Sequence, residues 1–162
     1  MQKKFTAKNN YLVGVISDTH GRLPQSVLKA FKNADLIIHA GDIGKQEILE
    51  YLRKIAPIIV VRGNMDTGNW AHHLPEKEVI KVCKFRLCVI HDVYKIELIS
   101  KSSTCQIVIS GHTHCPLVEK QQEVLFLNPG SAVQPRYGYR ASVALLRINE
   151  NSIDTRLIEI TD

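Results

Sequence analysis

The chain has 162 residues, a length that fits one domain, and its 44% hydrophobic and 23% charged content is ordinary for a soluble globular protein. No apolar run approaches the roughly 20 residues that span a bilayer, so we expect no membrane segment. The net charge of +5 would suit an anionic partner, but Lys and Arg are scattered, which gives no strong nucleic-acid signal. We expect residues 1–162 to form a single domain, with residues 1–10 as a short polar lead-in.

The cysteine spacing and the N-terminal sequence indicate the cellular compartment. The four cysteines form no C-x-x-C pair, and the basic N-terminal residues are followed by no apolar stretch of the kind found in secretion signals. We therefore expect a cytoplasmic protein with reduced, mostly buried thiols at Cys83, Cys88, Cys105 and Cys115.

The first half of the chain alternates apolar runs with segments of helical periodicity. Such an alternation predicts parallel strands joined by right-handed crossovers, which places the loops after the strands at one edge of a sheet. The run at residues 11–17 is long and apolar enough for a strand buried on both faces. Strands are expected at 11–17, 36–40 and 57–62, and helices at 24–33 and 45–55.

The second half predicts mainly strands. Two adjacent β-prone runs, 79–83 and 85–90, surround Lys84 and indicate an antiparallel hairpin, and a short helix-compatible piece follows at 94–100. Further strands, separated by turn residues, are expected at 106–110, 117–119, 124–127, 142–148 and 153–160.

Five of these apolar runs end in Asp, Asn or His. Polar residues just past the carboxyl ends of parallel strands converge on one crevice in an α/β sheet. Residues two apart in extended backbone leave the same side of the chain, so Asp18 with His20, and His112 with His114, could each chelate one ion. The complete set is Asp18, His20, Asp42, Asn64, His91, His112 and His114.

The chemistry of this set favours two metal ions. Seven nitrogen and oxygen ligands with no thiolate are too many for one tetrahedral zinc and suit two divalent ions of intermediate hardness. Asp42, in the middle of the set, is the natural bridge. Two ions about 3.5–4 Å apart can share a water, lower its pKa and hold both oxygens of an in-line displacement at phosphorus. The residues therefore predict phosphoester hydrolysis by a bridging hydroxide.

The same residues resemble a known family. Asp-x-His, Gly-Asp, Gly-Asn, a lone His and Gly-His-x-His, in this order, resemble the calcineurin-like metallophosphoesterases. The forms Ser-Asp-Thr-His-Gly, His-Ala-Gly-Asp, Gly-Asn-x-Asp, Gly-His-Thr-His and Asn-Pro-Gly-Ser are similar to those of its small single-domain bacterial and archaeal phosphodiesterases. The resemblance spans residues 12 to about 148. It implies an α/β fold, a four-layer α/β/β/α sandwich of two mixed β-sheets flanked by helices.

The resemblance also implies a metal, a substrate class, an oligomeric state and roles for the ligands. Manganese is the metal it favours, with nickel, cobalt, iron, zinc or magnesium as alternatives, and a small phosphoester is the expected substrate. Relatives often form dimers or tetramers, which suggests a homo-oligomer. One metal would be held by Asp18, His20 and His114 and the other by Asn64, His91 and His112, with Asp42 between them; the candidate catalytic residues are Asp42, Asn64, His91 and Asp66.

Two positions depart from the family pattern. Many relatives carry His after Gly-Asn as a proton donor, whereas Met65 stands here, and thioether sulfur cannot donate a proton. We therefore hypothesise that phosphodiesters, or esters with good leaving groups, are preferred over alkyl phosphomonoesters. Asp92 stands where Gly is usual, and its side chain could crowd the second metal or accept a hydrogen bond from an imidazole.

Four further residues have both a functional and an ordinary interpretation. Trp70 lies in the loop 66–75 and could stack on a nucleoside or aryl group, or belong to a plain surface loop. Arg136 could reach the substrate phosphate, or be a solvated charge. His39, within a strand, is expected to pack in the core or support the site, and Cys115 to be a small buried residue.

Other interpretations stay open for the site as a whole. Asp18 and Asp42 could be helix N-caps, the histidines could be structural, and Asn64 could be a turn residue. The fold could serve as a protein-binding module, as in the retromer subunit that shares it, but such a module has no reason to keep His91 and His114 together. The pI of about 9.1 suggests a nuclease, against which the lack of a basic stripe argues.

Overall fold

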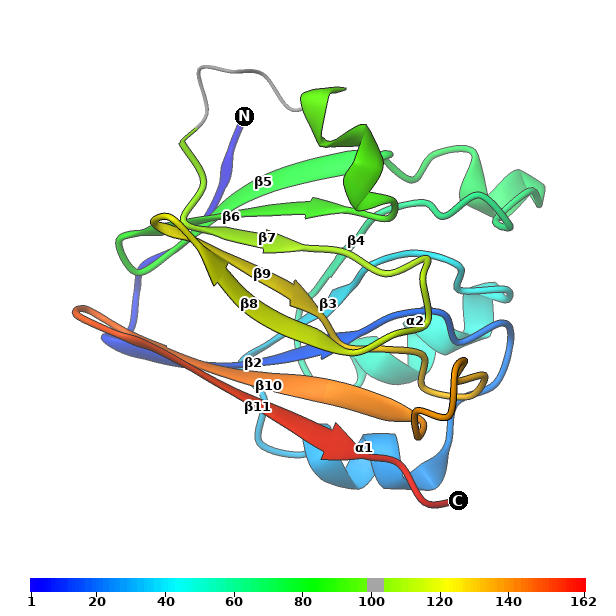
Figure 1. Cartoon of the computed structure of the whole chain (residues 1–162). Coiled ribbons are helices and arrows are strands. Elements are labelled where there is room, and N and C mark those ends of the chain that lie inside the picture. The colour runs from blue at the N-terminus through cyan, green and yellow to red at the C-terminus, as the bar shows by residue number, and fades with distance from the viewer. Residues whose placement is uncertain (99–103) are drawn as a thin grey trace.

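The computed structural model describes residues 1–98 and 104–162, which form two β-sheets packed face to face (Figure 1). The five-stranded sheet has the order β11 (Ile153–Glu159), β10 (Ser142–Asn149), β2 (Asn10–Ile16), β3 (Leu36–His39) and β4 (Ile58–Val60). The six-stranded sheet has the order β1 (Lys3–Phe5), β5 (Lys77–Val82), β6 (Phe85–Ile90), β7 (Ile107–Ile109), β9 (Val124–Asn128) and β8 (Leu117–Gln121).

Strand directions agree with the sequence predictions. β2, β3 and β4 pair in parallel, and so do β6 and β7, so the loops that follow these strands leave from carboxyl ends. β5 and β6 form the predicted antiparallel hairpin around Lys84. Both sheets are mixed, because β10 pairs antiparallel with β2 and β8 pairs antiparallel with β9.

Helices cover the outer faces of the sandwich. α1 (Gln25–Phe31) and α2 (Gln46–Arg53) pack on the five-stranded sheet (Figure 1). Over the described residues, the outer face of the six-stranded sheet carries the 3₁₀ helix η2 (Val93–Leu98), and a second 3₁₀ turn, η1 (Asn69–Ala71), follows β4. The predicted four-layer α/β/β/α order is confirmed. Residues 99 and 100 of the expected helical piece lie outside the described residues, and no described helix is long and apolar enough to cross a membrane.

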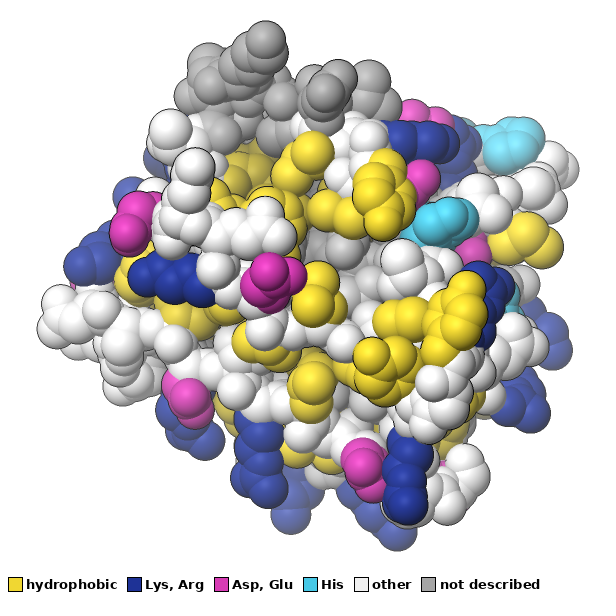
Figure 2. All heavy atoms as spheres, in the orientation of Figure 1, with side chains coloured by type: hydrophobic (Ala, Val, Ile, Leu, Met, Phe, Trp, Pro, Cys, Tyr) yellow, Lys and Arg dark blue, Asp and Glu magenta, His cyan; other side chains and the backbone are white. Residues whose placement is uncertain are grey.

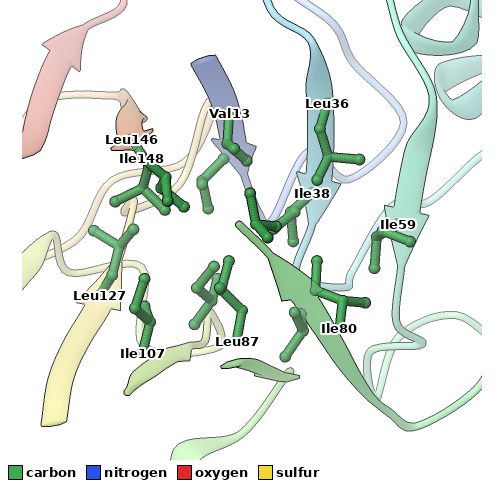
Figure 3. Packing of buried hydrophobic residues seen from close by; sticks show 14 of the residues in the cluster. Val13, Leu36, Ile38, Ile59, Ile80, Leu87, Ile107, Leu127, Leu146 and Ile148 are labelled. Atoms are coloured by element: carbon green, nitrogen blue, oxygen red, sulfur yellow. The ribbon is translucent and has the colours of Figure 1, made fainter. Parts of the chain in front are cut away.

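The main core lies between the two sheets. Branched aliphatic side chains from both inner faces interlock there, among them Val13, Ile38, Leu87 and Ile107 (Figure 3). The opposite face of the five-stranded sheet packs against α1 and α2, where Ile16 and Phe31 are fully buried. β2 is therefore buried on both faces, as its continuous apolar run predicts, and it fixes the position of the loop that follows it.

Two sequence expectations are wrong. Residues 1–10 are more than a polar lead-in, because Lys3–Phe5 forms the edge strand β1, parallel to β5. Cys88 and Cys105 form a disulfide and are not reduced thiols; Cys88 lies in β6 and Cys105 just before the neighbouring strand β7, with Cα atoms 5.9 Å apart, within bonding reach. Cys83, which is buried, and the half-buried Cys115 remain free.

Candidate metal centre

Seven polar side chains meet where the carboxyl ends of strands from both sheets come together. Asp18 and His20 follow β2, Asp42 follows β3 and Asn64 follows β4, all in the five-stranded sheet. His91 follows β6, and His112 and His114 follow β7, in the six-stranded sheet. The convergence expected from the βα pattern therefore draws on both sheets of the sandwich.

The first cluster consists of Asp18, His20 and His114. The Nε2 atom of His114 lies 3.2 Å from Nε2 of His20 and 3.2 Å from Oδ1 of Asp18. The Nδ1 atom of His114 donates a hydrogen bond to the carbonyl of Gln134 at 2.6 Å. If the neutral ring carries its hydrogen on Nδ1, Nε2 has a lone pair. This lone pair points at the Asp18 carboxylate oxygen.

Asp18 gives the clearest indication that this cluster suits a cation. Its Oδ2 atom accepts hydrogen bonds from the Ser17 hydroxyl at 2.7 Å and from the N–H of His112 at 3.1 Å. Its Oδ1 atom is buried and has no hydrogen-bond partner. A buried oxygen left unpaired is costly, and a positive ion between Oδ1 and the two Nε2 atoms would satisfy it.

The Asp18 carboxylate also affects the protonation of His114. In the neutral ring Nε2 carries no hydrogen, so Oδ1 of Asp18 stays without a partner; in the protonated ring Nε2 can donate to this carboxylate, which raises the pKa of His114 above its ordinary value, while burial and the charge of Arg136 oppose the rise. A proton on this ring places a positive charge next to the Asp18 carboxylate.

The second cluster consists of Asn64, His91 and His112. The Oδ1 atom of Asn64 lies 3.1 Å from Nε2 of His91 and 3.1 Å from Nδ1 of His112. His91 donates its Nδ1 hydrogen to the carbonyl of Ala40 at 2.7 Å, which directs Nε2 toward Asn64. One amide oxygen and two ring nitrogens thus face a common point.

Asp42 joins the two clusters. Its Oδ2 atom lies 3.4 Å from Nε2 of His91, and ligand atoms of Asp18, Asp42 and His91 all lie within 4.8 Å of one another. Burial raises the pKa of Asp42, but hydrogen bonds from His91 and from the N–H of Met65 outweigh burial and hold this pKa below its ordinary value. The Asp42 carboxylate is therefore ionised at neutral pH and lies between the clusters.

The donor set fits a pair of divalent ions. Each cluster offers ring nitrogen and neutral or anionic oxygen, and Asp42 is placed to serve both. The helix-cap interpretation does not apply to Asp18 or Asp42, because α1 begins after Pro24 and α2 after Lys45.

Backbone conformation at the ligands differs from the sequence expectation. Asp18, His20, Asp42, His112 and His114 have φ values of 54°, 44°, 55°, 70° and 60°, all in the left-handed region and not in extended backbone. Left-handed backbone is uncommon outside glycine and is concentrated at functional sites. The extended-backbone premise is therefore wrong: Asp18 and His20 still face one cluster, as expected, but His112 and His114 turn toward different clusters.

The structure explains why the residue before Asn64 is a glycine, Gly63. A Cβ atom at this position would collide with the Asp42 carboxylate and backbone. The glycine therefore gives the loop after β4 room to lie against the loop after β3, which brings Asn64 beside Asp42.

Asp66, a candidate catalytic residue, has both carboxylate oxygens occupied by backbone. Oδ1 accepts the N–H groups of Ile43 at 2.9 Å and Gly44 at 3.0 Å, and Oδ2 accepts the N–H of Gly63 at 2.8 Å. The side chain is buried. These contacts join the loops that carry Asp42 and Asn64, so the arrangement favours a positioning role for Asp66.

His39 and Thr19 support the loops from beneath. His39 is fully buried; its Nδ1 accepts the N–H of Gly41 at 3.2 Å and its Nε2 lies 2.9 Å from the Thr19 hydroxyl, which donates to the carbonyl of Ile43 at 2.9 Å. The expectation that His39 supports the site from the core agrees with these contacts.

The Asn-Pro-Gly-Ser segment has a role that its turn composition alone did not reveal. The Asn128 amide donates to the carbonyl of Gly111 at 2.9 Å and to Thr113 Oγ1 at 3.0 Å. The Ser131 hydroxyl donates to the carbonyl of Asp18 at 2.8 Å. The segment thus holds the loop after β7 and the loop after β2.

The other candidate residues are not members of the two clusters. Trp70 is half-buried, packs in the helix-side core and borders a hollow at the start of α2. Arg136 is exposed and lines a different hollow together with His112. Asp92 accepts a hydrogen bond from the N–H of Tyr94 at 3.1 Å, so the acceptor for His91 is the carbonyl of Ala40.

Residues 11–151 match the calcineurin-like phosphoesterase superfamily domain, and the chain belongs to this superfamily, whose members hydrolyse phosphoric esters. It is 37% identical, over 98% of its length and 86% of the relative, to a probable metallophosphoesterase of Methanocaldococcus jannaschii. It is 29% identical to the phosphodiesterase YfcE of Escherichia coli over 80% of this chain and 84% of that protein. The family and the hydrolase class predicted from the motifs are confirmed.

Solved structures share the fold. Vacuolar protein sorting 29 of Cryptosporidium parvum superposes with a TM-score of 0.82 at 23% identity, over 96% of this chain and 94% of that one. The structure of YfcE from E. coli gives a TM-score of 0.66 at 27% identity, over 93% of this chain and all of that one (100%).

Proposed function

We propose that the chain is a phosphodiesterase that works with two divalent metal ions, manganese first among them. Asp18, His20 and His114 would hold one ion, Asn64, His91 and His112 the other, and Asp42 would contact both. The observation that carries the proposal is the buried, unpartnered Oδ1 of Asp18 facing the Nε2 atom of His114. When bound, such a pair of ions supplies an activated water and neutralises charge on the phosphoryl group.

The chain's own residues prepare this chemistry before substrate arrives. The carbonyls of Ala40 and Gln134 fix the ring orientations of His91 and His114, leaving Nε2 of each directed inward. Asp42 stays ionised because His91 and the N–H of Met65 stabilise its charge. Asp66 and Ser131 hold the ligand loops, so little reorganisation is required when ions and substrate bind.

Met65 shapes the expected substrate preference. It follows Asn64, its side chain is 61% exposed, and it cannot donate a proton to a leaving group. Esters whose leaving group departs without protonation are therefore favoured. Rates on p-nitrophenyl and alkyl phosphomonoesters provide the measurement, and comparable rates on the two would refute this preference.

The main test uses metal-stripped protein refilled with single divalent ions and assayed on bis-p-nitrophenyl phosphate. We expect turnover that depends on the ion and is largest with manganese. Asp42→Asn should lose most of it, while Glu50→Gln, an exposed carboxylate on α2, should keep it. An active Asp42→Asn protein would remove Asp42 from its bridging role, and no turnover with any ion would overturn the enzyme proposal.

A second candidate function is a protein-binding module with little activity. The observation in its favour is the high fold likeness to vacuolar protein sorting 29. Both metal clusters are complete in this chain, which a pure binding module does not require. Absence of turnover with every ion in the same assay would favour the module.

A further inference from the structure

A hollow of about 800 Å³ opens beside the second cluster. Its lining combines the His112 side chain with apolar residues of η2, β8 and β9, including Val93, Leu117 and Phe126. Figure 2 shows hydrophobic side chains gathered around a depression on this face, with a histidine near its edge. This volume lies within the range of small-molecule sites, and His112 connects it directly to the candidate metal centre.

Three tyrosines surround this hollow and are unusually exposed. Tyr94 is 83% exposed, Tyr137 85% and Tyr139 49%. Large aromatic side chains left open to water beside a polar centre are more consistent with ligand contact than with core packing.

The backbone at Tyr137 is held in a conformation that costs free energy. Tyr137 has φ 54° and Gly138 φ 79°, and the N–H of Tyr139 bonds to the carbonyl of Arg136 at 3.0 Å, which closes a tight turn. Turns with two left-handed central residues favour Asn-Gly, and a bulky residue at the first of these positions is strained. The turn therefore keeps an exposed tyrosine at a position where Asn would be more stable. This favours a role in ligand contact for the Tyr137 ring.

Arg136 at the start of this turn supplies the charge that a phosphoester needs. It lines the same hollow as His112. A phosphoryl group at the metal centre would thus have a guanidinium on the side that faces the tyrosines.

Asn128 is one of the polar residues that line the hollow, and its side chain already has hydrogen-bond partners. The Asn128 amide is fully engaged with Gly111, Thr113 and the N–H of Gly130. Recognition here would rest on stacking and apolar burial, which accept any planar ring and reject small hydrophilic groups.

We propose that this hollow binds an aromatic group, of nucleobase or aryl size, on one ester arm of the substrate, stacked by Tyr137 and Tyr139 beside Arg136. This inference rests on the proposed function, because the phosphoryl group is placed at His112. It narrows the substrate class to phosphodiesters with at least one ring-bearing alcohol.

The test measures binding of non-hydrolysable phosphonates to the manganese-loaded protein by calorimetry. Methylphosphonate, benzylphosphonate and octylphosphonate share the charged group and differ only in the arm. We expect benzylphosphonate to bind at least about tenfold more tightly than methylphosphonate, which corresponds to about 1.4 kcal/mol. Equal affinities for these two would overturn the proposal. Tighter binding of octylphosphonate than of benzylphosphonate would also overturn it, in favour of a lipid chain.

Variants tie the preference to the turn. Tyr137→Asn should bring the benzyl-to-methyl ratio close to one while leaving the melting temperature unchanged or higher, since Asn tolerates left-handed backbone. Tyr139→Ala should lower the ratio, and Tyr51→Ala, at an exposed tyrosine on α2, should not. A ratio unchanged in both hollow variants would refute the assignment.

The two proposals fail separately. Hydrolysis of bis-p-nitrophenyl phosphate with equal binding of methyl- and benzylphosphonate would leave the enzyme proposal and remove the aromatic subsite. A tenfold benzyl preference with no turnover with any ion would keep the subsite and remove the phosphodiesterase function.

Discussion

His112 and His114 are two residues apart in the sequence, yet they belong to different clusters. Nδ1 of His112 lies 3.1 Å from Oδ1 of Asn64, and Nε2 of His114 lies 3.2 Å from Oδ1 of Asp18. Left-handed backbone at both residues produces this divergence, with Thr113 between them. One short loop therefore contributes to both halves of the centre, and it fixes the spacing of the two halves.

Asp18→Asn should separate protein stability from metal binding. In metal-free protein the substitution removes a buried charge that has an unpartnered oxygen, so the free energy of unfolding should stay the same or rise. Wild-type protein at a manganese concentration of 100 times the dissociation constant should gain about 2.7 kcal/mol, and the variant should gain much less. Thermal unfolding with and without manganese gives both values. An equal gain in the two proteins would exclude Asp18 as a ligand.

Asp66→Asn should act on loop stability and not on a catalytic proton. The amide nitrogen cannot accept the Gly63 N–H that Oδ2 now accepts, so we expect a loss of about 1–3 kcal/mol in urea unfolding. Activity should fall, but the pH–rate profile should keep its shape. Loss of one limb of that profile would instead identify Asp66 as a general acid or base.

His39 should make the fold sensitive to acid. Burial lowers the pKa of His39 to about 3, against the opposing charges of Asp18 and Asp42, whereas the unfolded chain takes up this proton near pH 6.5. Stability should therefore fall as pH drops from 6.5 toward 3. Between pH 6.5 and 5 the loss should be about 2 kcal/mol greater in the wild type than in His39→Gln. Urea unfolding of both metal-free proteins measures it, and parallel pH curves would contradict the assignment.

Gly14→Ala should destabilise the fold without touching the site. A Cβ at this β2 position would lie 2.8–3.0 Å from ring atoms of Phe31 in α1, closer than carbon atoms pack. We expect a loss of about 1–3 kcal/mol from overpacking. Phe31→Leu in the same chain should relieve part of this overlap. The double variant should therefore lose less free energy of unfolding than the sum of the losses in the two single variants. Strict additivity would show that the contact relaxes by another route.

The sequence predicted those parts of the fold that depend on long apolar runs. The strands β2, β3 and β6 and the polar residues that follow them have a strong signal, because each is buried and ends at the same edge. The strand β1 carries no such signal. It is short and exposed, and its register depends on pairing with β5 from a distant part of the chain.

The site shows the same division between local and distant information. The seven candidate ligands could be picked out because their motifs are local, and the structure brings their side chains together. The left-handed backbone at His112 and the hydrogen bonds of Asp66 and Ser131 could not, because they arise from contacts between loops far apart in the sequence. The Cys88–Cys105 disulfide was missed for a similar reason: it joins β6 to the segment just before β7, and the cysteine spacing does not reveal that these two strands pair.

Each cluster takes residues from both sheets, with Asp18 and His20 facing His114, and Asn64 facing His91 and His112. Any sliding of one sheet over the other would change the ligand spacing directly. The interior residues between the sheets, such as Val13 and Leu87, thus help to determine which ions fit and how far apart they lie, although neither residue is a ligand. A substitution among these buried side chains that moves one sheet relative to the other would therefore change the distances within both clusters.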